Sequence, residues 1–91
     1  MKRKKRVMMY ALSTCVWCKR AKRLLNDLGV VYDCIDVDLL PEDEEREARD
    51  TVERLNPEGS FPVIIVDNKD VIRGFDEDRI RRVLGRDGRD E

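Results

Sequence analysis

The amino-acid sequence predicts an α/β fold with the element order βαβαββα, in which a four-stranded mixed sheet carries helices on both faces. Three observations lead to this prediction. Short runs of β-branched and apolar residues recur along the chain, apolar residues between them repeat at helical spacing, and the last two runs are separated only by the polar turn 67–70. The 91 residues suffice for one modest core. We therefore expect residues 1–91 to form a single domain, with frayed ends at residues 1–6 and 86–91.

The first three predicted elements form a strand–helix–strand unit. Residues 7–12 are apolar and predict a strand, and the β-branched and aromatic residues 30–37 predict another. Residues 19–28 predict the helix between them, and its apolar face recurs at positions i, i+3, i+4 and i+7: Ala21, Leu24, Leu25 and Leu28. Gly29 ends this helix. Two strands joined by such a helix are expected to run parallel.

The second half of the chain predicts a helix, a hairpin and a last helix. Pro41 suits the first turn of the second helix, whose acidic start complements the helix dipole, and residues 56–59 stop that helix. Residues 61–66 and 71–73 predict the two strands of the hairpin. Asp76 begins the last helix. Because the hairpin adds an antiparallel pair to a parallel one, we expect a mixed sheet.

Composition narrows the possible classes of function. Lys and Arg number 19 and Asp and Glu 20, so the net charge is −1 and nothing indicates a nucleic-acid partner. The chain has no histidine, which removes the commonest metal ligand and general base. No apolar run approaches the roughly 20 residues that span a bilayer, and the basic start leads only into a short strand, unlike a signal peptide. We expect a cytoplasmic monomer that binds neither nucleic acid nor a membrane.

The most informative motif is Cys15-Val16-Trp17-Cys18, between the first strand and the first helix. At a helix N-terminus, free backbone N–H groups and the helix dipole favour a thiolate on the first cysteine. A thiolate is the nucleophile of thiol–disulfide exchange, and the second cysteine lies close enough to resolve a mixed disulfide. In a cytosolic protein such a pair is catalytic or metal-binding rather than a permanent cross-link.

Metal binding is the main alternative for this motif. A zinc site with the same spacing needs two further ligands, and Cys34 is the only other cysteine in a chain without histidine, so we expect no metal site. We expect Cys34, within the second strand, to be a small buried hydrophobic residue. A non-enzymatic iron–sulfur or metal carrier that uses the two motif cysteines stays open as an alternative function.

Three blocks of the chain resemble the glutaredoxin family, the smallest form of the thioredoxin fold. They are residues 10–18, 60–62 (Ser-Phe-Pro) and 73–76 (Arg-Gly-Phe-Asp), within a resemblance that spans about residues 7–85. The resemblance implies a thiol–disulfide oxidoreductase that reduces protein disulfides or glutathione mixed disulfides. It also implies glutathione as co-substrate, no tightly bound cofactor, and disulfide-containing or glutathionylated proteins as partners.

The resemblance also implies roles for individual residues. Cys15 would be the nucleophile and Cys18 the resolving thiol, with Thr14 and Lys19 in support. Pro62 would be a cis residue facing the motif. The residues implied in substrate or glutathione binding are Trp17, Phe61, Pro62, Gly74, Phe75 and Asp76. In this set the backbone of Phe61 would pair with an incoming peptide, and the turn at residues 74–76 would bind the γ-glutamyl end of glutathione.

The chain departs from the usual family pattern at four places. The family often has proline where Val16 stands, a Thr-Val-Pro sequence at residues 60–62, and a second glycine where Arg73 stands. A lysine that often contacts the glutathione carboxylate is replaced by Leu12. These differences bear on glutathione rather than on the fold or the thiol chemistry. They leave open a redoxin of the kind that donates electrons to ribonucleotide reductase and is itself reduced by a thioredoxin-type reductase.

Overall fold

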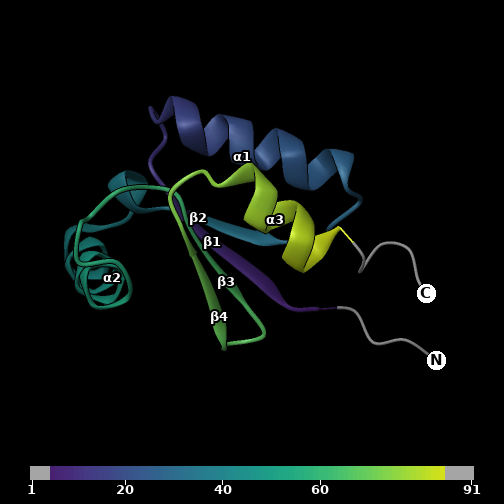
Figure 1. The fold of residues 1–91 in the computed structure, drawn as a ribbon. Helices are drawn as coiled ribbons and strands as arrows, with labels where there is room; N and C mark the ends of the chain where they lie inside the picture. Colours follow the sequence, from purple (N-terminus) through teal and green to yellow (C-terminus); the bar gives the residue numbers. More distant parts are fainter. Residues whose placement is uncertain (1–4, 86–91) are drawn as a thin grey trace.

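The computed structural model describes residues 5–85 and has the predicted element order, with one short 3-10 helix added before the second α-helix (Figure 1). Fraying is expected at residues 1–6 and 86–91, of which residues 1–4 and 86–91 lie outside the described residues. Arg6 is held in place, because its N–H donates to Oδ1 of Asp67 at 2.9 Å and its carbonyl oxygen accepts from the Asp67 N–H at 2.8 Å. Within residues 5–85, no helix combines the length and the apolar character needed to cross a membrane.

The sheet is mixed, as predicted, and its strand order is β2-β1-β3-β4. The strands are β1 (Val7–Ala11), β2 (Asp33–Asp36), β3 (Val63–Val66) and β4 (Asp70–Arg73). β1 runs parallel to β2 and antiparallel to β3, and β3 runs antiparallel to β4. The central strand β1 alternates between buried and half-buried residues, so one of its faces lies in the core.

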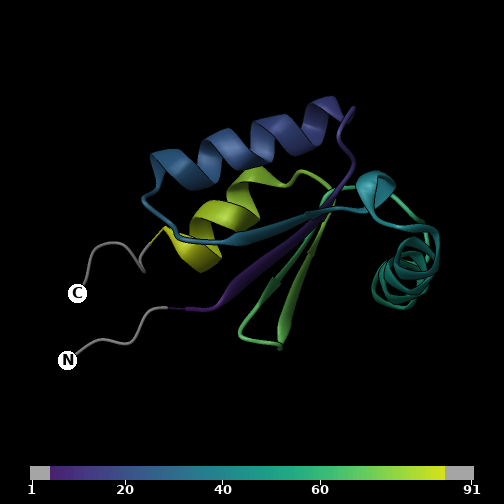
Figure 2. The same ribbon diagram turned by 180° about the vertical axis from the view of Figure 1, so that it is seen from behind.

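Two of the α-helices lie side by side over one face of the sheet (Figures 1 and 2). The helices are α1 (Val16–Asp27), α2 (Glu42–Leu55) and α3 (Glu77–Leu84), and the 3-10 helix is η1 (Val37–Leu39). The main core cluster joins α1 and α3 to the sheet and includes Met9, Leu25, Ile64 and Ile80. α2 packs apart from this cluster, against η1 (Figure 1).

Three element boundaries differ from the predicted ones. α1 begins at Val16, earlier than predicted, because the side chain of Cys15 caps the helix. β3 begins only at Val63, since the preceding Pro62 has no backbone N–H for the strand ladder. β2 is confined to residues 33–36, because its pairing with β1 begins at Asp33 and the chain turns into η1 directly after Asp36.

Candidate active site

The strand register brings distant segments of the predicted site to one end of the sheet. Tyr10 in β1 pairs with Val63 in β3, and Val63 pairs with Arg73 in β4. Just beyond these positions lie the cysteine motif, Pro62 and Gly74. The Gly74 N–H donates to the carbonyl oxygen of Pro62 at 2.8 Å, and the φ of +74° at Gly74 is one that glycine adopts without strain.

Cys15 is the N-cap residue of α1. Its backbone is extended, with φ −83° and ψ 117°, and its Sγ accepts a hydrogen bond from the Cys18 N–H at an N···Sγ distance of 3.1 Å. The side chain is partly exposed and packs against the main core. This N–H and the positive end of the helix dipole stabilise negative charge that develops on the sulfur. The predicted nucleophile is therefore both reachable and preoriented.

Cys18 lies one helical turn behind Cys15 and is fully buried. Burial, together with the hydrogen bond to the Cys15 side chain, raises the pKa of the Cys18 thiol to about 12. The thiol is consequently protonated at neutral pH. Both cysteines are free thiols in this structure, which is the reduced form of the pair.

Trp17 and Phe75 form one aromatic surface beside the cysteine motif. Trp17 is 52% exposed, and its ring stacks on that of Phe75 with a centroid distance of 5.8 Å and an interplanar angle of 27°. The guanidinium carbon of Arg20 lies 5.0 Å from the centroid of the Trp17 ring. The stack joins the start of α1 to the turn before α3, which places two of the predicted contact residues together.

The remaining predicted contact residues lie around the same end of the sheet. The Phe61–Pro62 peptide bond is cis, as predicted. Pro62 is fully buried, whereas Phe61 is half-buried and packs against the core. Asp76 is the N-cap of α3, and its carboxylate accepts a hydrogen bond from the Arg79 N–H at 3.1 Å. The Asp76 side chain therefore serves at least as a helix cap.

The structure does not connect the two residues predicted in supporting roles to the thiols through their side chains. Thr14 and Lys19 are both exposed, and neither side chain makes a hydrogen bond or ion pair with another residue in the range 5–85. Only the backbone of Lys19 contacts the site, since its N–H donates to the Cys15 carbonyl oxygen at 3.2 Å. A supporting role for either side chain stays a prediction.

Sequence reasoning missed an anchor of the loop that carries Cys15. The Ser13 N–H donates to Oδ1 of Asp38 at 2.8 Å, and the Ser13 hydroxyl donates to Oδ2 at 2.5 Å. These hydrogen bonds hold the pKa of Asp38 below its usual value. Asp38 lies in η1, 25 residues further along the chain, so no local pattern links it to Ser13.

A second missed anchor holds the loop before Pro62. Asn56 is buried at 2% exposure, and its Nδ2 donates to the carbonyl oxygen of Ser60 at 3.0 Å and to the Ser60 hydroxyl at 2.9 Å. Arg73 reaches the same region, because its Nε donates to the carbonyl oxygen of Leu55 at 2.6 Å. The Asn-Pro sequence predicts the end of α2, yet it gives no indication of the partner of the amide.

Cys34 lies on β2 and is only half-buried, less than predicted. Burial raises the pKa of the Cys34 thiol, and the nearby Lys22 offsets part of this rise. The Nζ of Lys22 pairs with Oδ1 of Asp36 at 3.5 Å. In the described part of the chain, no three Cys, Asp or Glu side chains lie together as a group that could hold a metal ion.

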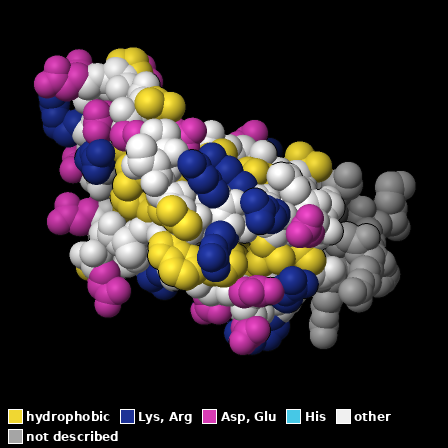
Figure 3. Space-filling view, turned by 90° about the horizontal axis from the view of Figure 1, so that it is seen from above, with side chains coloured by type: hydrophobic (Ala, Val, Ile, Leu, Met, Phe, Trp, Pro, Cys, Tyr) yellow, Lys and Arg dark blue, Asp and Glu magenta, His cyan; other side chains and the backbone are white. Residues whose placement is uncertain are grey.

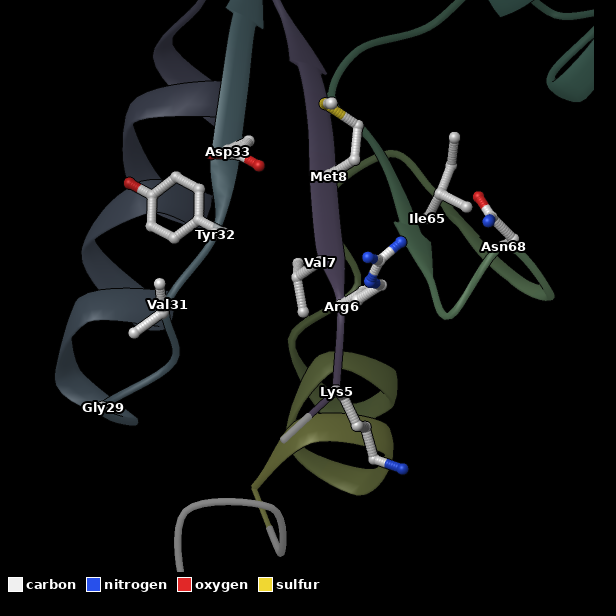
Figure 4. Close-up of a pocket in the computed structure, with 10 residues that line it drawn as sticks. All are labelled: Lys5, Arg6, Val7, Met8, Gly29, Val31, Tyr32, Asp33, Ile65 and Asn68. Atoms are coloured by element: carbon white, nitrogen blue, oxygen red, sulfur yellow. The ribbon is translucent and has the colours of Figure 1, made fainter. Parts of the chain in front are cut away.

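A hollow of the described structure is lined by residues at the beginning of β1 and the chain before β2 (Figure 4). It has a volume of about 650 Å³ and opens beside the beginning of β1, whereas Cys15 follows the end of that strand. Its walls include Met8, Tyr32 and Ile65, and no cysteine lines it. It therefore does not contribute to the thiol site.

A comparison with known protein families identifies one family model that matches this chain. The family model for glutaredoxin matches residues 7–71. This range contains both cysteines and Pro62, whereas the Gly74–Asp76 turn and α3 lie beyond it.

Solved structures of similar proteins agree with the fold. Methanoredoxin of Methanosarcina acetivorans is 49% identical, has a TM-score of 0.83, and matches over 89% of this chain and 85% of its own. A glutaredoxin of Methanosarcina mazei Go1 is 52% identical, with a TM-score of 0.81, over 89% of this chain and 79% of its own. An uncharacterized glutaredoxin-like 8.6 kDa protein from the rubredoxin operon of Clostridium pasteurianum is 30% identical over 78 residues, which cover 86% of this chain and 96% of that protein. The predicted thioredoxin-like fold is thus confirmed.

Proposed function

The chain belongs to the glutaredoxin family of thiol–disulfide oxidoreductases, and from that premise we propose that it reduces protein disulfides by a dithiol mechanism at Cys15 and Cys18. The contrast between the two thiols carries this proposal. Cys15 is partly exposed at a helix N-terminus and accepts an N–H hydrogen bond, whereas Cys18 is buried and protonated behind it. One thiol is thus suited to attack an external disulfide and the other to act only afterwards.

In the first step the Cys15 thiolate attacks one sulfur of the substrate disulfide. A new S–S bond joins Cys15 to the substrate, and the other substrate sulfur leaves as a thiolate that takes up a proton. In the second step Cys18 loses its proton and attacks Sγ of Cys15, which releases the second substrate thiol. The substrate disulfide gains two electrons, and the protein dithiol becomes a disulfide.

The raised pKa of Cys18 suits this order of events. Burial is its largest cause, and the Cys15 side chain contributes by its hydrogen bond and its charge. Once Cys15 is held in a mixed disulfide it carries no negative charge, so part of the barrier to Cys18 deprotonation disappears. Cys18 therefore becomes a better nucleophile only after a substrate has been captured.

We propose glutathione as the co-substrate that restores the dithiol, with the turn at residues 74–76 and the Trp17–Phe75 stack next to its entry point. The cap of α3 at Asp76 and the hydrogen bond between Gly74 and Pro62 support this placement. Leu12 stands where the family often has lysine, and Nε of Arg73 is engaged by Leu55. A flavin reductase of the thioredoxin type is the alternative reductant. A dithiol pair of this kind suits the reducing cytoplasm.

The mechanism is tested with Cys15→Ser and Cys18→Ser, with Cys34→Ser as the control. We expect Cys15→Ser to abolish reduction of a protein disulfide and Cys18→Ser to accumulate a mixed disulfide at Cys15, identified by intact mass and peptide mapping. Cys34→Ser should reduce the substrate at the wild-type rate. Full activity of Cys15→Ser would show that the mechanism is wrong.

A further inference from the structure

One face of α1 carries positive charge that its surroundings do not neutralise. Lys19, Arg20 and Arg23 are exposed, and none of these side chains forms an ion pair with a carboxylate within residues 5–85. Lys22, on the same helix, differs because it pairs with Asp36 on β2. The charge therefore accumulates on the outer side of α1, directly after the cysteine motif.

Arg20 and Arg23 border a shallow groove between α1 and α3. The groove has a volume of about 300 Å³, and its lining residues are Arg20, Arg23, Leu24, Asp27, Phe75, Glu77 and Arg81. Two carboxylates line the groove: Glu77 is paired with Arg81 at 2.9 Å, and Asp27 lies at the far end of α1, one turn beyond Arg23. Arg20 and Arg23 therefore set the charge of the end nearest the Trp17–Phe75 stack. Figure 3 shows Lys and Arg side chains gathered in the middle of this face, beside hydrophobic ones.

Positive and negative charges are distributed unevenly over the surface of the molecule. The net charge of the chain is only −1, yet the first turn of α2 is entirely acidic, with Glu42, Asp43, Glu44 and Glu45. α2 lies apart from α1 and α3 (Figure 1). A partner that carries negative charge is therefore attracted to the outer surface of α1 and repelled from the acidic first turn of α2.

Building on the proposed function, we propose that this groove docks an acidic segment of the substrate protein next to its disulfide cysteine. Arg20 and Arg23 follow Cys15 along α1 by roughly 7 and 12 Å, at 1.5 Å per residue. An extended chain advances about 3.3 Å per residue, so the carboxylates belong about two to four residues from the substrate cysteine. Phe75, which lines the groove and stacks on Trp17, gives the same segment an apolar contact.

The test is a single-turnover reduction of two homodimeric peptide disulfides that differ only near the cysteine. One carries Asp at the second to fourth positions on both sides of the cysteine, and the other carries Lys there. At low ionic strength we expect the reduced protein to react about tenfold faster with the Asp peptide, in the range that electrostatic steering provides. The preference should shrink as salt rises past about 0.1 M, where the Debye length is about 10 Å. Equal rates for the two peptides at low salt would overturn the proposal.

Charge-reversal variants show which part of the surface causes the preference for the Asp peptide. Arg23→Glu should remove most of the preference for the Asp peptide, because Arg23 lines the groove without contacting the Trp17 ring. Arg54→Glu, an exposed change of the same charge in the last turn of α2, should leave the ratio of the two rates at its wild-type value. A similar fall of the ratio in both variants would overturn the groove as the docking site.

A binding measurement separates this inference from the proposed function. Trp17 is the only tryptophan of the chain, so its fluorescence reports directly on the groove. Asp and Lys peptides in which serine replaces the cysteine cannot undergo exchange. We expect the Asp peptide to change the Trp17 emission at a lower concentration than the Lys peptide, even if no disulfide were reduced. The absence of this difference would contradict acidic docking, whereas failure of disulfide reduction with the difference intact would contradict only the proposed function.

Discussion

At the scale of single residues, the two cysteines differ in solvent exposure because they occupy different positions at the N-terminus of α1. Cys15 lies outside the first turn, where its Sγ accepts an N–H hydrogen bond and solvent reaches it. Cys18 lies inside the turn on the buried face of α1, within the same core as Met9 and Leu25. One helical turn is therefore enough to give the two thiols opposite accessibility, which is the basis of the roles that we propose for them.

This difference predicts the pH dependence of alkylation. Burial raises the pKa of Cys18 to about 12, so the neutral thiol is favoured in the folded protein and the thiolate forms only as the pH approaches that value. At pH 7 we expect iodoacetamide to label Cys15 much faster than Cys18 in the reduced Cys34→Ser protein, measured by intact mass. Labelling of Cys18 should rise steeply above pH 10. Equal labelling of both thiols at pH 7 would contradict the assigned roles.

At the scale of elements, the site depends on loops that are tied to distant parts of the chain. Ser13 in the loop before Cys15 is held by Asp38 of η1. The loop before Pro62 is held by Asn56 at the end of α2. α2 and η1 therefore position both loops of the site without contributing a reacting group.

Replacing the buried amide should destabilise the protein. Asn56→Ala leaves the Ser60 carbonyl oxygen without its donor, and a lost buried hydrogen bond of this kind costs about 1–3 kcal/mol. Urea unfolding should show a lower free energy of unfolding by about that amount. Ser60→Ala removes only the hydroxyl contact and should cost less. A loss as large in Ser60→Ala as in Asn56→Ala would show that the backbone contact is not the important one.

The Asp38 anchor predicts a specific loss of stability in acid. The pKa of Asp38 is lowered in the folded protein, chiefly by the side-chain hydrogen bond from Ser13. Its stabilising effect is therefore fully present above the unfolded-state pKa, near 3.9, and is lost as the pH falls through the lower folded-state value. Between pH 5 and pH 2, roughly the range set by these values, wild-type protein should lose more stability than Asp38→Asn.

Thermal or urea unfolding across this pH range measures the difference. Asp50→Asn is the matched control, since Asp50 is exposed on α2 and makes no hydrogen bond or ion pair through its side chain within residues 5–85. Its acid profile should follow that of the wild type. If Asp38→Asn also followed the wild-type profile, Asp38 would not be the group responsible.

At the scale of the whole molecule, the fold influences the reduction potential of the Cys15–Cys18 pair. The Cys15 sulfur lies at the N-terminal, positive end of α1 and accepts the Cys18 N–H, and this environment favours the reduced form over the disulfide. Stabilisation of the reduced form raises the reduction potential. A measured reduction potential therefore shows how strongly the surroundings of the two cysteines favour the reduced form.

Titration in glutathione redox buffers, read by intact mass, measures this potential. We expect a midpoint of about −200 to −230 mV, in the range of glutaredoxins, with a glutathione adduct on Cys15. A midpoint near about −270 mV without an adduct would instead indicate a redoxin supplied by a thioredoxin-type reductase. The absence of a disulfide at any potential would contradict the enzymatic function and favour the metal-carrier alternative.

The sequence by itself determined the element order, the helix end at Gly29 and the position of the Cys15–Cys18 motif, because propensities, capping and turn residues act within a few positions of the chain. The cis bond before Pro62 followed from family resemblance. Only the tertiary structure decided which distant groups meet at this end of the sheet. The contacts it decided are the Trp17–Phe75 stack, the Ser13–Asp38 and Asn56–Ser60 anchors, and the Lys22–Asp36 ion pair. These contacts depend on strand register and helix packing, which join residues that no local pattern in the sequence connects.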